Sequence, residues 1–416
     1  MCNINVEIVH DGLYLRIDIF ILRILIVMNK VYKVLLIIDF SEDYGRALLR
    51  GIAKFSQLFG PWIFCRMPIH PRKKGDIEEI TKWALQWGAN GIIAQIQTQN
   101  EAEHLIQTGI PVIAQDLMER FADISNITGL YKETGRMAAE HFLQRGFTQF
   151  AFYGLANMVW SRERLNGFAQ CLAEKAYNTF VYDQPKQKKT TLWSYIETPL
   201  LDWLQGLPKP IAILACDDNH GQIVLEACKI CGIDVPEQIA IIGVDNDEVV
   251  CNLLEPPLSS ISLNTEKAGF ETAHLLQRMM MGETTIPEDI IVEPVQVIVR
   301  RSSDVFAIQD KEMAKALKFI YYNFKDSIQV DDVVNATALS RRVLEKRFSN
   351  VLGKSILEEI TNLRIEHVSK MLIETNISIS EIASISGYAD VRNLSRFFKS
   401  RKQLSPLAYR KKFSIC

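Results

Sequence analysis

The chain has 416 residues, more than one ordinary domain, so two or three compact units with cores of their own are expected. Apolar residues make up 48% of it and charged residues 23%, a balance that excludes a largely disordered chain. The net charge of −2 hides an uneven distribution, because residues 311–416 hold 19 Lys and Arg against 11 Asp and Glu, whereas residues 1–310 hold 28 against 38. The basic C-terminal part predicts a polyanionic partner.

The N-terminal residues and the cysteines exclude further classes. Residues 13–28 are very apolar, but Arg16, Asp18 and Arg23 interrupt them before the run of about 20 residues that spans a bilayer, so no membrane partner is expected. We interpret residues 1–27 as a non-native N-terminal extension. The eight cysteines are scattered through apolar contexts, which indicates reduced thiols in a cytoplasmic protein. The CxxC pair at 228 and 231 lacks further ligands, so no metal and no cofactor are expected.

From residue 34 onward, short apolar runs alternate with amphipathic segments. The predicted strands are residues 34–40, 62–67, 91–96, 111–116, 150–154, 180–183, 211–216, 239–245, 259–263 and 292–301, and the predicted helices are residues 44–59, 78–87, 132–145, 161–176, 194–205, 221–231 and 265–281. Continuous apolar strands separated by helices are typical of parallel sheets that are covered on both faces. This many strands favours two similar α/β lobes, so we assign residues 28–300 to one two-lobe domain.

Acidic side chains follow several of these strands, at the edge where ligands of such sheets bind. They are Asp39, Asp43, Asp116, Asp217, Asp218, Asp245 and Asp247. With Arg162, Arg164 and Trp160 they could hold a sugar, because hydroxyl groups pair with carboxylates and guanidinium groups while an aromatic ring covers the C–H side. Any one of these acids could instead cap a helix. No phosphate-binding glycine loop, nucleophile elbow or HExxH motif is present, so an enzyme is not expected.

Residues 377–413 carry the clearest functional pattern, an amphipathic segment, a turn at Gly387 and a second helix from residue 391. Along that second helix the apolar arc is Val391, Leu394, Phe397 and Phe398, and the opposite arc is Arg392, Asn393, Arg396 and Lys399. This arrangement predicts a helix-turn-helix unit with a basic recognition helix that binds double-stranded DNA. The alternative is a basic helix that is merely solvated.

A second copy of this pattern lies 50 residues earlier, where residues 344–348 match residues 394–398. The predicted exposed face of that helix is Arg341, Arg342, Glu345 and Lys346, against an apolar face of Val343, Leu344 and Phe348. We therefore assign residues 301–310 to a linker and residues 311–416 to an all-α domain with two helix-turn-helix units. The first-turn residues of both recognition helices, Arg341, Arg342, Arg392 and Asn393, are expected to reach base edges. Lys399 is expected to contact phosphate, and Arg396 either to do so or to brace its unit.

These motifs resemble known families. Residues 382–410 resemble the closing motif of the AraC/XylS family in Ile382-Ala383, Gly387-Tyr388, Leu394-x-Arg396-x-Phe398-Lys399 and Pro406-x-x-Tyr409-Arg410. The chain departs from that motif at Leu394, where the family usually has an aromatic residue, and at Gln403, where it usually has glycine. Residues 34–300 are similar to the periplasmic-binding-protein-like sensors of the LacI/GalR type, through the segments at residues 164–168, 232–237 and 242–246.

The order of a sensor followed by an AraC-type domain is similar to that of pentose-operon regulators. The resemblance implies a cytoplasmic activator that binds DNA as a homodimer, contacts RNA polymerase and takes a pentose, xylose or arabinose, in the cleft between its lobes. The sugar contacts that it implies are Asp116, Arg164 and Asp245, with Asp218 and Tyr44 as further members. The alternative is a sugar-binding transport component without a DNA function, which would need an export signal and would leave the basic repeat without a role.

Overall fold

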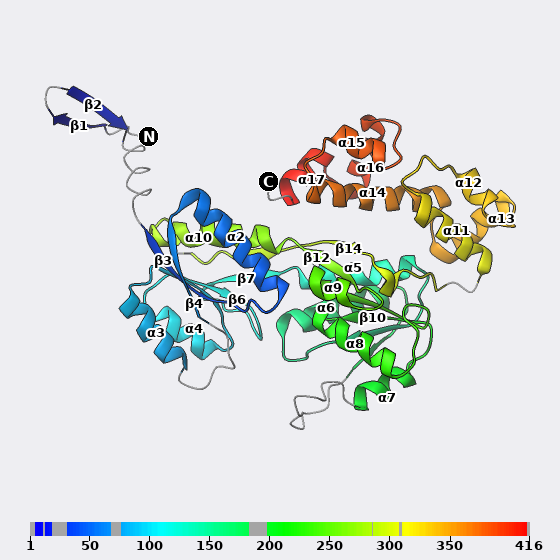
Figure 1. Ribbon diagram of the computed structural model, residues 1–416, viewed down its shortest axis with the longest axis horizontal. Helices are drawn as coiled ribbons and strands as arrows, with labels where there is room; N and C mark the ends of the chain where they lie inside the picture. The colour runs from blue at the N-terminus through cyan, green and yellow to red at the C-terminus, as the bar shows by residue number, and fades with distance from the viewer. Residues whose placement is uncertain are drawn as a thin grey trace. The chain divides into compact units, whose positions relative to one another are not determined.

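The computed structural model describes residues 5–10, 13–18, 31–67, 76–182, 198–284, 286–307 and 310–413 (Figure 1). The interpretation of residues 1–27 falls largely outside these ranges, although β1 (Asn5–His10) and β2 (Leu13–Asp18) pair as an antiparallel hairpin. The chain divides into two compact bodies, of which the first comprises residues 1–128 and 268–291 and the second residues 129–267 and 292–416. No helix in the described ranges is long and apolar enough to cross a membrane.

The first body is a six-stranded α/β lobe with the strand order β13-β7-β6-β5-β3-β4. Its strands are β3 (Tyr32–Ile37), β4 (Trp62–Arg66), β5 (Gly91–Gln95), β6 (Val112–Gln115), β7 (Ser125–Gly129) and β13 (Ile290–Val292). Helices α3 (Asp76–Trp87) and α4 (Gln99–Ile106) cover one face, and α2 (Asp43–Phe59) and α10 (Thr265–Met280) the other (Figure 1). Strands β3 to β7 are parallel, as predicted.

The second body begins with a sheet of the same kind, in the order β14-β12-β11-β10-β8-β9. Its strands are β8 (Phe150–Tyr153), β9 (Thr179–Val181), β10 (Ile211–Ala215), β11 (Ile239–Asp245), β12 (Ser259–Leu263) and β14 (Pro294–Ile298). Its helices are α5 (Tyr131–Gln144) and α6 (Val159–Ala173) on one face, and α7 (Thr198–Gly206), α8 (Asp218–Ile230) and α9 (Glu248–Leu253) on the other. Along β10, alternate residues face the two helical layers, which explains its continuous apolar sequence.

The strand predicted for residues 292–301 is confirmed over residues 294–298, but the range also includes the end of another strand. The chain forms two short strands there, β13 at the edge of the first sheet and β14 at the edge of the second, antiparallel to β12. The sequence pattern cannot reveal this change of sheet, because it does not say which sheet a strand joins.

Residues 301–303, at the start of the predicted linker, form a short 3-10 helix, η1, that packs into the second lobe. The Ser302 hydroxyl donates to the carbonyl of Ile241 in β11 at 2.7 Å and accepts the Ser259 N–H at 2.8 Å. The neighbouring Ser303 hydroxyl donates to the Ser259 hydroxyl at 2.8 Å. Both serines are fully buried, so this part of the segment is anchored to the lobe.

The C-terminal part of the second body is all α. Its helices are α11 (Lys311–Asn323), α12 (Val330–Asn335), α13 (Arg341–Leu352), α14 (Ile356–Glu374), α15 (Ile379–Ile385), α16 (Val391–Lys402) and α17 (Pro406–Phe413). Helices α12 and α13 form the first helix-turn-helix unit and α15 and α16 the second, each with its own apolar core. The predicted fold, two parallel α/β lobes followed by an all-α domain with two helix-turn-helix units, is confirmed.

The two recognition helices bury the faces that the sequence predicts, with one exception. In α16, Leu394 and Phe398 are fully buried and Val391 and Phe397 pack partly against them. In α13, Leu344 and Phe348 are buried, but Val343 is 41% exposed, so its place on the apolar face was wrong. Leu344 and Phe348 are four residues apart and define the buried stripe, from which Val343 is turned by about 100°.

Helix α16 ends at Gln403 in the left-handed region, with φ of 58°. The equivalent end of α13 is Gly353, with φ of 67°. A side chain makes this conformation costly, because its Cβ crowds the following carbonyl, whereas glycine adopts it freely. The departure from the family pattern at Gln403 therefore places strain at the end of the second recognition helix.

We expect Gln403→Gly to raise the free energy of unfolding of the helical domain by up to about 1 kcal/mol, since relief of strain outweighs the greater freedom of the unfolded chain. Thermal denaturation of the full chain, followed by circular dichroism at 222 nm, measures the change in Tm. The reciprocal variant Gly353→Gln should lower Tm, and an unchanged or lower Tm for Gln403→Gly would contradict the strain.

Candidate functional site

Helix α6 places the Arg164 side chain at the carboxyl edge of the second sheet. Arg164 is only 3% exposed, and its guanidinium group donates to the carbonyl of Cys216 at 2.5 Å and to a carboxylate oxygen of Asp245 at 3.4 Å. The guanidinium carbon lies 5.2 Å from the Trp160 ring centre and 5.6 Å from that of Tyr131. Burial alone would lower the pKa of Arg164, but Asp245, together with Tyr131, Cys216 and Asp217, outweighs burial and raises that pKa, so the side chain is a fixed cation.

Close packing of α5 against α6 fixes the position of this arginine. A Cβ on Gly135 would lie 2.0 Å from the Arg164 carbonyl oxygen, and one on Gly167 would lie 1.9 Å from the Lys132 carbonyl oxygen. Glycine at both positions lets the two helix backbones touch. Arg164 therefore begins from a rigid backbone site, and its long side chain spans the remaining distance to β10 and β11.

Asp245 ends β11 in an unusual backbone conformation. Its φ is 102° and that of the next residue, Asn246, is 55°. Residues other than glycine adopt such angles at an energetic cost, and they do so most often at functional sites. The Arg300 guanidinium group donates to the side-chain oxygen of Asn246 at 2.9 Å. The backbone N–H of Asn246 donates to the Ser260 hydroxyl at 3.0 Å. The surrounding lobe thus holds the Asp245 carboxylate against Arg164.

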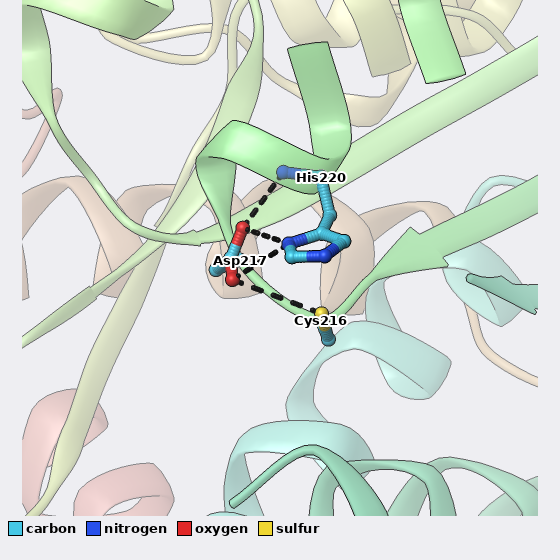
Figure 2. Close-up of side chains that lie close together, drawn as sticks. All are labelled: Cys216, Asp217 and His220. Atoms are coloured by element: carbon cyan, nitrogen blue, oxygen red, sulfur yellow. Dashed lines mark hydrogen bonds and ion pairs between the residues drawn. The ribbon is translucent and has the colours of Figure 1, made fainter. Parts of the chain in front are cut away.

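Next to this pair, the start of α8 brings together Cys216, Asp217 and His220 (Figure 2). Asp217 caps the helix by accepting the His220 N–H at 2.7 Å, and both of its carboxylate oxygens lie 2.8 Å from the His220 Nδ1. Burial raises the pKa of Asp217, but the bonds to His220 outweigh it and lower that pKa. Asp217 therefore orients the imidazole ring, whose centre lies 5.7 Å from the centre of the Tyr153 ring.

These three side chains are donors of the types that bind Zn²⁺, and in the described ranges they are the one such group. Their surroundings oppose a cation. Arg164 bonds the Cys216 carbonyl, and the start of α8 is the positive end of a helix. Burial holds the pKa of the Cys216 thiol well above its usual range, so the metal-binding thiolate is disfavoured. The cluster suits a neutral ligand that donates and accepts hydrogen bonds.

Asp218 points into the protein. One of its oxygens accepts the Ser260 hydroxyl at 2.5 Å and the other accepts the Asp247 N–H at 2.7 Å, and the side chain lies against Gly243. Burial, with Asp245 nearby, raises the pKa of Asp218 well above its usual range. Its carboxyl group holds β12 and the start of α9, which favours a structural role for Asp218 over a sugar contact.

In the first body, Asp116 follows β6 and is 2% exposed. It accepts the Thr128 hydroxyl at 2.6 Å and pairs with the Arg120 Nε at 3.4 Å, while that Nε also donates to the Thr128 hydroxyl at 2.7 Å. Tyr44 lies in the first turn of α2, after β3. Of the expected sugar residues, the structure brings Arg164 and Asp245 into direct contact; Asp116 and Tyr44 belong to the other body.

In the all-α part of the second body, the residues expected to contact DNA lie on the outer faces of α13 and α16. Arg392, Arg396 and Lys399 are exposed, and Arg396 donates to the Asn393 side-chain oxygen at 3.3 Å, which favours its bracing role. On α13, Arg342, Glu345 and Lys346 are likewise exposed. Arg341 is tied to two carboxylates, those of Asp331 at 2.9 Å and Glu345 at 3.0 Å.

Comparisons with known proteins agree with both halves of the chain. A model of the periplasmic binding protein-like domain matches residues 139–303, and a model of a helix-turn-helix domain matches residues 333–412. The xylose operon regulatory protein of Escherichia coli strain K12 is 30% identical over 391 residues, which are 92% of this chain and 97% of that protein. The chain belongs to the xylose operon regulatory protein family. Members of that family are sugar-responsive transcription regulators that bind DNA through a helix-turn-helix domain.

Two further matches from this comparison fit that assignment. The xylose operon regulatory protein of Haemophilus influenzae is 29% identical over 392 residues, or 92% of this chain and 99% of that protein. The structure of the xylose-binding transcription activator XylR is 28% identical and matches 93% of this chain and all of that chain, with a TM-score of 0.58. A transport component would not explain a match that extends through both helix-turn-helix units.

The sequence did not predict several side chains that lie at the candidate site. His220, Thr128 and Arg120 lie on no predicted functional motif. The spacing of Asp217 and His220, one helical turn apart at the end of a strand, could have indicated their pairing. The roles of Thr128 and Arg120 depend on the pairing of β6 with β7, a strand whose polar sequence gave no sign of it.

We expect Asp218→Ala to destabilise the second lobe rather than to act on sugar binding directly. It leaves the Ser260 hydroxyl and the Asp247 N–H buried without their acceptor, at a cost of about 1–3 kcal/mol for each group. Urea denaturation followed by tryptophan fluorescence measures this cost. A variant as stable as the wild type, with weakened sugar binding, would return Asp218 to the sugar contacts.

Proposed function

We propose that this chain is a transcription activator of pentose-catabolic genes that responds to xylose or a closely similar pentose. The observation that carries the proposal is the buried Arg164 cation held against Asp245, with two aromatic rings beside it, at the carboxyl edge of a parallel sheet. Sugars need this combination, because adjacent hydroxyl groups accept from a guanidinium and donate to a carboxylate. The ring faces suit their C–H surfaces.

Further contacts follow from the same chemistry. His220, oriented by Asp217, is well placed in the second lobe to exchange a hydrogen bond with a hydroxyl group. Asp116, fixed by Thr128 and Arg120, and Tyr44 are the proposed contacts from the first lobe. A bound sugar shifts the protein only as far as it binds one conformation better than the other. We propose that it favours the conformation in which residues 311–416 bind DNA.

The proposed DNA partner spans two successive major grooves, about 34 Å apart, each read by one recognition helix. Arg342, Arg392 and Asn393 are the proposed base contacts and Lys346 and Lys399 the phosphate contacts, with Glu345 holding Arg341. A homodimer, contact with RNA polymerase and a cytoplasmic location follow from the resemblance to pentose-operon regulators. We propose domain boundaries at residues 28–300 and 311–416, with residues 301–303 of the intervening segment anchored to the sensor.

The sugar site is tested by titrating the full chain with D-xylose, L-arabinose and D-ribose in an isothermal calorimeter. Asp245→Ala should weaken binding of the preferred pentose about tenfold or more, because a hydrogen bond to a charged group contributes about 1.5–3 kcal/mol. Asp234→Ala, which changes an exposed aspartate in the same lobe, should bind like the wild type. Equal affinities for the wild type and Asp245→Ala would exclude Asp245 from the site.

The DNA contacts are tested with a duplex selected by the wild-type protein and a scrambled duplex of the same length. Arg392→Ala should lose about 1–3 kcal/mol on the selected duplex and little on the scrambled one, since it is expected to read a base. Lys399→Ala should weaken both evenly and flatten the dependence of log Kd on log salt. Fluorescence anisotropy measures both; equal losses on the two duplexes for Arg392→Ala would refute its reading of a base.

A further inference from the structure

The two helix-turn-helix units have separate cores that meet at one point of the connecting helix α14. The first core takes Ile356, Ile360 and Leu363 from α14, and the second takes Ile365, Val368 and Leu372. No residue belongs to both cores in the part of the chain that the structure describes. Arg364 lies between the two sets, so the helix changes partners at this residue.

Arg364 holds the loop that leads into the first helix-turn-helix unit. Its Nε donates to the Phe324 carbonyl at 2.8 Å, and its Nη2 donates to the carbonyls of Asp326 at 2.6 Å and Ile328 at 3.3 Å. These three carbonyls belong to the segment between the end of α11 and the start of α12. The planar guanidinium group fits such a set of acceptors better than an ammonium group could, because its N–H groups point in fixed directions.

The same arginine faces the turn of the second unit. Its guanidinium carbon lies 5.9 Å from the centre of the Tyr388 ring, beside Gly387. Burial lowers the pKa of Arg364, with Tyr388 opposing, and burial raises the pKa of Tyr388 to about 12. The two side chains thus form a half-buried contact, in which directed interactions are stronger than at a fully exposed surface.

Gly387 allows the two units to touch. Its φ is 72°, and a Cβ there would lie 2.7 Å from the Asp326 carbonyl oxygen, 3.0 Å from that of Lys325 and 2.9 Å from the Arg364 Nε. The turn of the second unit therefore packs directly on the loop of the first, with Arg364 between them. The other polar link that we identify, between Arg401 and Glu358 at 3.5 Å, is exposed on both sides and weak by comparison.

We propose that Arg364, packed between the loop at residues 324–328 and the turn at Gly387 and Tyr388, sets the distance and rotation between the two recognition helices and so selects DNA by half-site spacing. This inference rests on the proposed DNA-binding function. One inserted base pair shifts the second half-site by about 3.4 Å and turns it by about 35°, which a rigid pair of units cannot follow. Arg364 is a positioning residue, since its bonds are used within the protein.

The test compares the full-length wild type with Arg364→Met and a matched control, Arg410→Met. Arg410 also donates to two carbonyls, those of Leu372 at 3.2 Å and Ile377 at 2.8 Å, but both belong to the second unit alone. Each protein selects duplexes from a random library in the presence of D-xylose and L-arabinose. Sequencing gives the two half-site motifs and the distribution of spacings between them, and anisotropy then measures affinity for the best duplex with one base pair inserted between its half-sites.

We expect the wild type to select one dominant spacing and to lose at least tenfold in affinity on the insertion. Arg364→Met should keep both half-site motifs, accept two or more spacings and lose threefold or less on the insertion. Arg410→Met should keep the wild-type spacing. If Arg364→Met does not fold by circular dichroism, Arg364→Lys and Tyr388→Leu replace it, with the same broadening expected.

Two results overturn the inference alone. One is a folded Arg364 variant that keeps the single spacing and the tenfold insertion penalty, and the other is equal broadening by Arg410→Met, which would mean a general loosening of the domain. A wild-type protein that selects no sequence would overturn the proposed function itself, and the inference with it.

Discussion

The buried Arg164 cation is the interaction on which the candidate sugar site depends. It is held by a carbonyl at the end of β10 and a carboxylate at the end of β11, and it is covered by Tyr131 and Trp160. A charge this far from water is stable only while its partners stay in place. The backbone contact between α5 and α6, the left-handed angle at Asp245 and the capping of α8 by Asp217 all serve that arrangement.

The two helix-turn-helix units share a fold but differ in their charges. Arg341 of the first unit is tied to Asp331 and Glu345, so DNA must compete with two carboxylates for it. On the second recognition helix, no ion pair of Arg392 is found among the residues that the structure describes. Arg392 is therefore more openly presented than Arg341.

Much of this architecture follows from the sequence, where a residue's role depends on its near neighbours. Strands such as β10 are apolar throughout because both faces are buried, and the recognition helices show their buried stripes through Leu344, Phe348, Leu394 and Phe398. Strand β7 was not predicted, because its serine, asparagine and threonine are polar residues that are buried through partners elsewhere in the chain, Asp289 among them. Likewise, the sequence shows Asp217 and Asp218 as an equal pair. In the folded lobe, Asp218 points inward to Ser260 of β12, whereas Asp217 holds His220.

The anchored serines after the second lobe bear on how such a protein could be recombined. Strand β11 presents Asp245 at its end and, four residues earlier, holds Ser302 through the Ile241 carbonyl. Residues 301–303 are thus part of the sensor's core, although in the sequence they look like the start of a tether. A chimaeric regulator joined at residue 300 would lack Ser302 and Ser303, so the Ile241 carbonyl in β11 and Ser259 in β12 would lose hydrogen-bond partners. Val305 and Ala307 also pack against the core of that lobe, and the Ala307 N–H donates to the Arg145 carbonyl at 2.9 Å, so a graft that keeps the lobe's contacts would join after residue 307.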